Sequence, residues 1–149
     1  GVHLLLQVDL EAGVRARAAG FEDAVRTALR GSEIRRSAPE RLGASVKFRT
    51  LDPAEAERAA DLIRDEDPTA VVTVGDNGEI TVGFAEDDER ELRQSMLAQT
   101  IEIIRRRVDA LGTKEPIIQR QGDDRVVVQV PGFDDPTTLK DVIGTTAQL

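Results

Sequence analysis

The sequence predicts an α+β protein made of two βαββαβ units in tandem, with mainly antiparallel sheets and helices packed on one face of each sheet. Two observations lead to this prediction. Segments of alternating hydrophobicity and segments of helical periodicity follow one another in the same order in both halves. Each half also contains an Asp-Pro helix start, at Asp52-Pro53 and at Asp135-Pro136. We therefore expect one unit over residues 1–77 and a second over residues 78–149.

The first half opens with a strand and continues as a helix. Side chains alternate between two faces over residues 2–9, which predicts a strand. From Glu11 to Gly31 the hydrophobic residues recur every three or four positions, a spacing typical of an amphipathic helix. The residues of its expected buried stripe are Val14, Ala18, Phe21, Val25 and Ala28. Two strands should follow, at residues 33–36 and 45–50.

The remainder of the first half contains a helix and a hairpin. Asp52 can accept hydrogen bonds from free amides and proline is tolerated in a first helical turn, so we expect a helix from Asp52 to Asp67. Segments 70–74 and 79–84 flank the sequence Gly75-Asp76-Asn77-Gly78. Such residues readily adopt the positive φ angles of a tight turn, which predicts a β-hairpin.

The second half repeats this order. A long helix is predicted over residues 87–111, strands over 116–121 and 125–130, and a short helix over 135–144. The expected buried stripe of the long helix is Leu97, Ile101, Ile104, Val108 and Leu111. A further strand should begin within residues 147–149. The order βαββαβ is that of the ferredoxin-like fold, so we expect two ferredoxin-like units.

The composition disfavours several classes of binding partner and binding site. The net charge is −8, which disfavours a nucleic-acid partner. Four Phe with no Tyr or Trp provide few aromatic platforms for bases or ligands. The chain has no cysteine, so disulfides and thiolate metal sites are excluded. We also find no run of about 20 apolar residues that would span a membrane.

Each residue type that could act in catalysis or bind a metal ion has a structural explanation in this sequence. His3 is the one histidine and lies in a predicted strand. The acidic groups at residues 65–67 and 86–89 fall at helix ends, where capping explains them. Residues 76–78 are explained as a turn, and the three arginines at 105–107 spread around a helix. We therefore predict no enzyme activity and no catalytic, cofactor-binding or metal-binding residue.

Three linked phrases stand in the last third of the sequence. They read IEIIRRRVDALG at 101–112, EPIIQRQGDDRVVVQVPG at 115–132, and D-P-x-x-x-K-x-x-x-G-T-T-A-Q-L at 135–149. These phrases resemble the SecD family of bacterial protein-export membrane proteins. The opening GVHLLLQVD at 1–9 is similar to the family segment that follows its first membrane helix. The resemblance is dense in the last third and loose over 11–86, so unit 78–149 would carry the family signature and unit 1–77 would be variable.

The resemblance implies a function for the chain. It would be part of the first periplasmic region of a multi-pass inner-membrane protein that works with SecF beside the SecYEG channel and uses the proton gradient in protein export. Its role would be that of a structural base that contacts protein neighbours, and translocating preprotein, through a sheet edge. A family head subdomain would follow Leu149. A small-molecule-binding regulatory domain of ferredoxin-like fold is the alternative, and an RNA-binding module fits the charge poorly.

Overall fold

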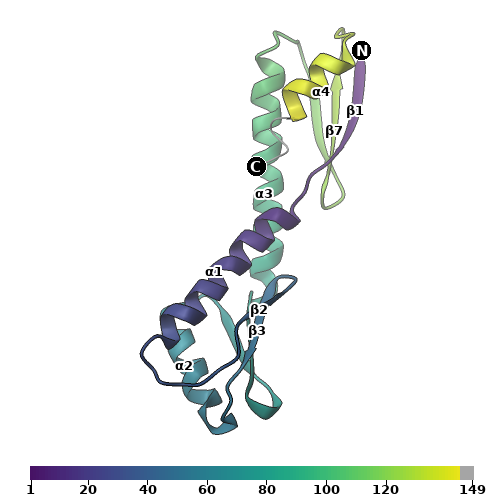
Figure 1. Ribbon diagram of the computed structural model, residues 1–149. Coiled ribbons are helices and arrows are strands. Elements are labelled where there is room, and N and C mark those ends of the chain that lie inside the picture. Colours follow the sequence, from purple (N-terminus) through teal and green to yellow (C-terminus); the bar gives the residue numbers. More distant parts are fainter. Residues whose placement is uncertain (145–149) are drawn as a thin grey trace. The chain divides into compact units, whose positions relative to one another are not determined.

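A computed structural model describes residues 1–144 and shows an α+β protein with two antiparallel sheets, as the sequence predicts (Figure 1). The longer elements follow the predicted order. Their bounds are β1 Val2–Gln7, α1 Glu11–Leu29, β2 Glu40–Leu42, β3 Ser45–Arg49, α2 Ala56–Glu66, β4 Val71–Val74, β5 Glu79–Gly83, α3 Glu86–Asp109, β6 Ile117–Gln121, β7 Arg125–Val130 and α4 Pro136–Gly144, with short 3-10 turns η1 at Pro53–Glu55 and η2 at Asp76–Gly78.

The chain forms two compact units, and their boundaries differ from those expected. Unit 1 combines residues 1–11 with the chain from residue 91 onward, and unit 2 comprises residues 12–90. The expected division into 1–77 and 78–149 is therefore corrected. The physical reason is strand pairing, because β1 pairs along its whole length with β7 and not with a strand of its own half.

Unit 1 contains a three-stranded sheet in the order β1-β7-β6, and both pairings are antiparallel. Helices α3 and α4 cover one face of this sheet. Its core residues are Val2, Leu4, Val8, Leu10, Leu97, Ile104, Val108, Ile118, Val126, Val128, Val130, Leu139 and Ile143. β7, the third strand of unit 1 along the chain, lies between β1 and β6, as the third strand does in a ferredoxin-like unit. Along the chain, unit 2 is inserted between β1 and α3, the first strand and the first helix of unit 1.

Unit 2 contains a four-stranded antiparallel sheet in the order β2-β3-β5-β4. Helices α1 and α2 cover one face of it. Its core residues are Phe21, Val25, Leu29, Ile34, Val46, Phe48, Ala56, Ala59, Ala60, Ile63, Ala70, Val72, Ile80 and Val82. The rings of Phe21 and Phe84 meet edge to face, with centroids 5.1 Å apart. Each unit therefore has its own core and a sheet with helices on one face.

Both predicted Asp-Pro helix starts are confirmed. Asp52 Oδ1 accepts a hydrogen bond from the amide of Ala54 at 3.0 Å. Asp135 Oδ1 accepts from the amides of Thr137 and Thr138 at 3.1 and 3.2 Å. Each aspartate thus satisfies amides that have no partner within the first helical turn.

The predicted hairpin of unit 2 is also confirmed. β4 and β5 pair in an antiparallel register, and the turn between them places Asn77 at φ 56° and Gly78 at φ 80°. Asparagine and glycine tolerate positive φ angles, and they occupy the two positions where this turn requires them.

The strand predicted at residues 33–36 is wrong. This stretch has a single isolated bridge, from Arg36 to Thr50, and the strand beside β3 is β2, at Glu40–Leu42. The amide of Ile34 instead bonds to Ser32 Oγ at 3.2 Å, which turns the chain locally. The strand predicted at 147–149 lies outside the described residues. None of the helices between residues 1 and 144 has the length and hydropathy that a membrane span requires.

Candidate interaction surfaces

The acidic groups that the sequence places at helix ends are engaged there. Asp67 Oδ1 accepts hydrogen bonds from the amide and the hydroxyl of Thr69, and Asp67 Oδ2 lies 3.7 Å from Arg17 Nη2. Residues 86–89 form the acidic first turn of α3. Within residues 1–144, no group of three His, Cys, Asp or Glu side chains is placed to hold a metal ion.

The single histidine lies on a strand and the arginine run lies on a helix. His3 lies on β1 opposite Gln129 of β7. Arg105 Nε lies 3.9 Å from Glu102 Oε1, and Arg107 Nη1 donates to the backbone oxygen of Val142 at 3.4 Å. The arginine run thus serves local contacts on α3, in agreement with its interpretation as a helix surface.

One carboxyl group has a shifted pKa. The Thr138 hydroxyl, which donates to Asp135 Oδ2 at 2.6 Å, lowers the pKa of Asp135 below its ordinary value, and the amides of Thr138 and Thr137 act in the same direction. The shift comes from hydrogen bonds that favour the charged form. Because these bonds are those of a helix cap, the shift marks a structural role.

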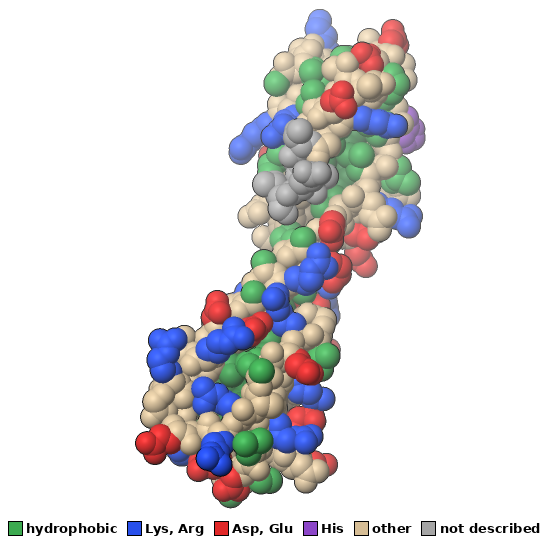
Figure 2. Space-filling view, in the orientation of Figure 1, with side chains coloured by type: hydrophobic (Ala, Val, Ile, Leu, Met, Phe, Trp, Pro, Cys, Tyr) green, Lys and Arg blue, Asp and Glu red, His purple; other side chains and the backbone are tan. Residues whose placement is uncertain are grey.

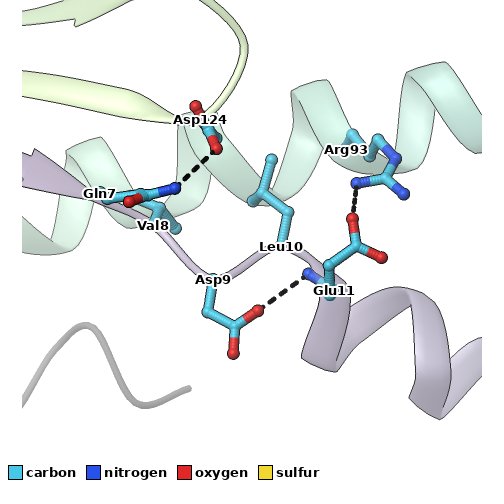
Figure 3. Close-up of a pocket in the computed structure, with 7 residues that line it drawn as sticks. All are labelled: Gln7, Val8, Asp9, Leu10, Glu11, Arg93 and Asp124. Atoms are coloured by element: carbon cyan, nitrogen blue, oxygen red, sulfur yellow. Dashed lines mark hydrogen bonds and ion pairs between the residues drawn. The ribbon is translucent and has the colours of Figure 1, made fainter.

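A hollow of about 370 Å³ lies at the end of β1 in unit 1 (Figure 3). It is lined by Gln7, Val8, Asp9, Leu10, Glu11, Arg93 and Asp124. Gln7 Nε2 donates to Asp124 Oδ2 at 3.3 Å, and Arg93 Nη1 lies 2.6 Å from Glu11 Oε1. Asp9 Oδ1 accepts from the amide of Glu11 at 3.1 Å. The polar groups thus bind one another and fix the turn from β1 into α1.

The face of the unit 1 sheet that lies opposite its helices carries few charges. The register pairs His3 with Gln129, Leu5 with Val127 and Gln7 with Arg125, and on the other side of β7 it pairs Gln129 with Ile117, Val127 with Gln119 and Arg125 with Gln121. Directly paired residues share a face. This open face therefore presents aliphatic and amide side chains, with Leu5 56% exposed and Ile117 42% exposed.

The unit 2 sheet also has an open face, but this face carries the charged side chains of Glu40, Lys47, Arg49 and Glu79. Val71 pairs with Gly83 at one edge, and Leu42 pairs with Ser45 at the other. A hollow of about 300 Å³ lies on this face. It is lined by Ala44, Ser45, Val71, Thr73, Thr81, Gly83, Phe84 and Glu89. Gly83 has no side chain to fill the space above β5, and hydroxyl and aliphatic groups form the floor.

The exposed large hydrophobic residues gather on these two faces. Leu5 and Ile117 lie on the open face of unit 1, and Leu42 and Val71 lie on that of unit 2. Leu51, the most exposed at 63%, immediately follows β3 and its adjoining bridge residue. Leu42 and Val71 lie at opposite edges of their sheet, whereas Leu5 and Ile117 lie on either side of β7.

The sequence pattern favours contact through a sheet edge and does not reveal the open faces. The signal was present at the N-terminus, where Leu5 takes an outward position between Leu4 and Leu6. An outward leucine by itself is ordinary. Only the pairing of β1 with β7 and β6 places it beside Val127 and near Ile117.

Comparison with known proteins finds similarity to one family. The family model described as "Protein translocase subunit SecDF, P1 domain, N-terminal" matches residues 97–149. The SecD protein translocase subunit of Rickettsia bellii is 36% identical over all of this chain, and that of Magnetococcus marinus is 34% identical; the chain covers 29% of each. The Pseudomonas aeruginosa subunit is 35% identical over all of this chain, which covers 24% of it.

The two comparisons cover different parts of the structure. The family model matches a stretch that lies wholly within unit 1, whereas the relatives match unit 2 as well. The chain spans less than a third of the length of these relatives. Along its whole length this chain is therefore similar to a part of the SecD translocase subunits, and its residues 97–149 are similar to the N-terminal part of the P1 domain.

Proposed function

We propose that this chain is a periplasmic domain of a SecD subunit that assists protein export through the SecYEG channel, driven by the proton gradient and in partnership with SecF. Its role is that of a non-enzymatic base that contacts protein neighbours at the periplasmic face of the inner membrane. The observation that carries the proposal is similarity to SecD translocase subunits over the entire chain.

The open sheet faces support a role in protein contact. A protein interface has an apolar centre that is depleted of charge and a polar rim. The open face of unit 1 has this composition, with Leu5, Val127 and Ile117 at its centre and glutamines around them. In a chain with 32% charged residues, such a face is exceptional and suits a protein partner.

The test is site-specific photocrosslinking in the full-length parent protein during export. Probes replace Leu5 and Ile117 on the open face of unit 1, and Val71 and Thr81 on that of unit 2. A matched control probe replaces Arg106, an exposed residue on α3. We expect crosslinks from the sheet faces, and far fewer from the control, to SecF, to the channel or to the translocating chain.

The partner recovered distinguishes two forms of the proposed role. Crosslinks to the translocating chain would assign the face to substrate handling, and crosslinks to the channel or SecF would assign it to a mechanical base. Equal crosslinking from Arg106 and from the sheet faces, or no crosslink to any export component, would contradict the proposal.

A further inference from the structure

One segment of unit 2 is basic although the whole chain is acidic. Residues 26–49 contain seven basic and two acidic side chains, whereas the whole chain contains 20 basic and 28 acidic. The basic residues are Arg26, Arg30, Arg35, Arg36, Arg41, Lys47 and Arg49. Figure 2 shows Lys and Arg side chains, with Asp and Glu side chains among them, over the part of the molecule that contains α1 and α2. The segment 26–49 is therefore basic along the sequence.

Some of these cations are neutralised and others are not. Arg26 and Arg41 share the carboxylate of Glu22, and Lys47 Nζ lies 3.2 Å from Glu79 Oε1. Among residues 1–144, no carboxylate oxygen lies within 4.0 Å of a side-chain nitrogen of Arg35 or Arg49; Glu79, the register partner of Arg49, pairs with Lys47. The positive charges of Arg35 and Arg49 remain available to a partner.

The Arg36 side chain is bound without losing its charge. Its Nη1 donates to the backbone oxygen of Ile34 at 2.8 Å, and that oxygen carries no formal charge. Arg36 pairs with the buried Thr50, so alternation directs its side chain to the side of the sheet opposite to Arg35 and Arg49.

The backbone brings Arg35 and Arg49 together. The amide of Leu51 donates to the oxygen of Arg35 at 2.9 Å, Arg36 bridges to Thr50, and the amide of Ser37 donates to the oxygen of Arg49 at 2.9 Å. Arg35 and Arg49 are thus diagonal neighbours on two adjacent extended segments, a relation that places Cα atoms about 7–8 Å apart. Thr50 is fully buried, so alternation directs Arg35, Arg49 and Leu51 to the opposite, open side.

Protection of a sheet edge explains only part of this arrangement. Positive charges and proline on an outer strand prevent pairing with other strands. That accounts for Arg35, Arg36 and Pro39, which lie at the edge. It does not account for Arg49, because β3 lies between β2 and β5. Nor does it account for Leu51, since an exposed leucine makes association with another strand more favourable.

We propose that Arg35, Arg49 and Leu51, the Arg-Leu patch, dock onto an anionic phospholipid surface. Arginines bind headgroup phosphates, and a projecting aliphatic side chain enters the boundary between headgroups and acyl chains. Leu51 is 63% exposed and lies beside the cations, which favours a bilayer over an acidic protein segment that would need charge alone. The negative charge elsewhere is screened beyond about 8 Å at physiological ionic strength, so the patch acts locally.

The test is flotation of the 149-residue chain with vesicles. The vesicles contain equal parts phosphatidylglycerol and phosphatidylcholine, or phosphatidylcholine alone. The variants are R35Q/R49Q and L51S, and the matched control is R105Q/R106Q, which removes the same number of positive charges from α3. Thermal unfolding by circular dichroism verifies that each variant remains folded. Glycerol phosphate and polyglutamate are added separately as competitors.

We expect binding to the anionic vesicles alone, with R35Q/R49Q weakening it by about 25-fold, because each basic residue contributes about fivefold near such a surface. L51S should also weaken binding, R105Q/R106Q should have little effect, and neither soluble competitor should displace the protein at concentrations comparable to the lipid. Equal loss in both double variants, or no binding to anionic vesicles, would overturn the proposal. Displacement by polyglutamate would assign the patch to an acidic protein, and displacement by glycerol phosphate to a soluble phosphate, and either result would overturn it as well.

Discussion

Gly78 is the residue whose replacement the structure forbids most clearly. It has φ +80°, and a Cβ atom added there would lie 2.6 Å from the backbone oxygen of Thr50. Thr50 is fully buried, and its amide donates to the oxygen of Gly78 at 2.9 Å. Neither side of this contact can move without disturbing the junction between the hairpin turn and the end of β3.

We therefore predict that G78A destabilises the protein markedly more than G43A does. Gly43 also has positive φ, at +61°, but a Cβ atom there would have nothing within 4 Å. G43A should lower the free energy of unfolding by about 1–2 kcal/mol, because alanine is strained at positive φ. G78A should cost at least about 1 kcal/mol more, because backbone must also shift. Urea unfolding at 25 °C measures both values, and equal losses would show that the close approach to Thr50 has no energetic weight.

At the scale of elements, the start of α4 should respond to pH through Asp135. Its pKa is lowered in the folded state, chiefly by the Thr138 hydroxyl. A lowered folded pKa means that the contribution to stability is present above the unfolded value of about 3.9 and is lost as the pH falls through the folded pKa. Acid should therefore loosen this helix start.

We predict that D135N retains the cap at neutral pH but loses this part of the acid response. Asparagine also caps helices and does not titrate. The stability difference between the native chain and D135N should therefore shrink as the pH is lowered below about 4. T138V should raise the pKa of Asp135 toward its ordinary value, which carbon-detected NMR titration measures directly. An unchanged pKa in T138V would contradict the assigned cause.

Local signals in the sequence were sufficient for most elements but not for β2. Asp52, Asp135 and the turn at 75–78 predict boundaries that the structure confirms, because capping and positive φ are local requirements. β2 has three exposed residues, so no alternation marks it. Ile34 is buried without being in a strand, and its single hydrophobic position misled the prediction of a strand at 33–36.

The arrangement of the whole molecule depends on pairing between distant residues. Val2 pairs with Val130, and nothing near either residue indicates this partner. Two successive βαββαβ patterns are therefore compatible both with tandem units and with one unit inserted into another. The open faces follow from the same pairing, so the candidate surfaces could be identified only after the sheets were known.

The insertion makes a prediction about fragments of nearly equal length. Residues 12–90 retain both helices and all four strands of unit 2, with the complete core from Phe21 to Phe84. Residues 1–77 lack β5, the strand between β3 and β4, and with it the fully buried Ile80 and Val82. We expect fragment 12–90 to unfold cooperatively on heating, and fragment 1–77 to show no cooperative transition and to expose apolar surface.

Circular dichroism melting curves and binding of a hydrophobic dye measure this difference on the two fragments under one condition. Small domains of this size have little stability to spare, so loss of the central strand should abolish folding and not merely lower the melting temperature. The substitution I80N in fragment 12–90 supplies a matched control, since it places an amide in the same core without shortening the chain. A cooperative transition in fragment 1–77 would mean that β1 can replace β5, and the chain would then have two competing folds for its first half.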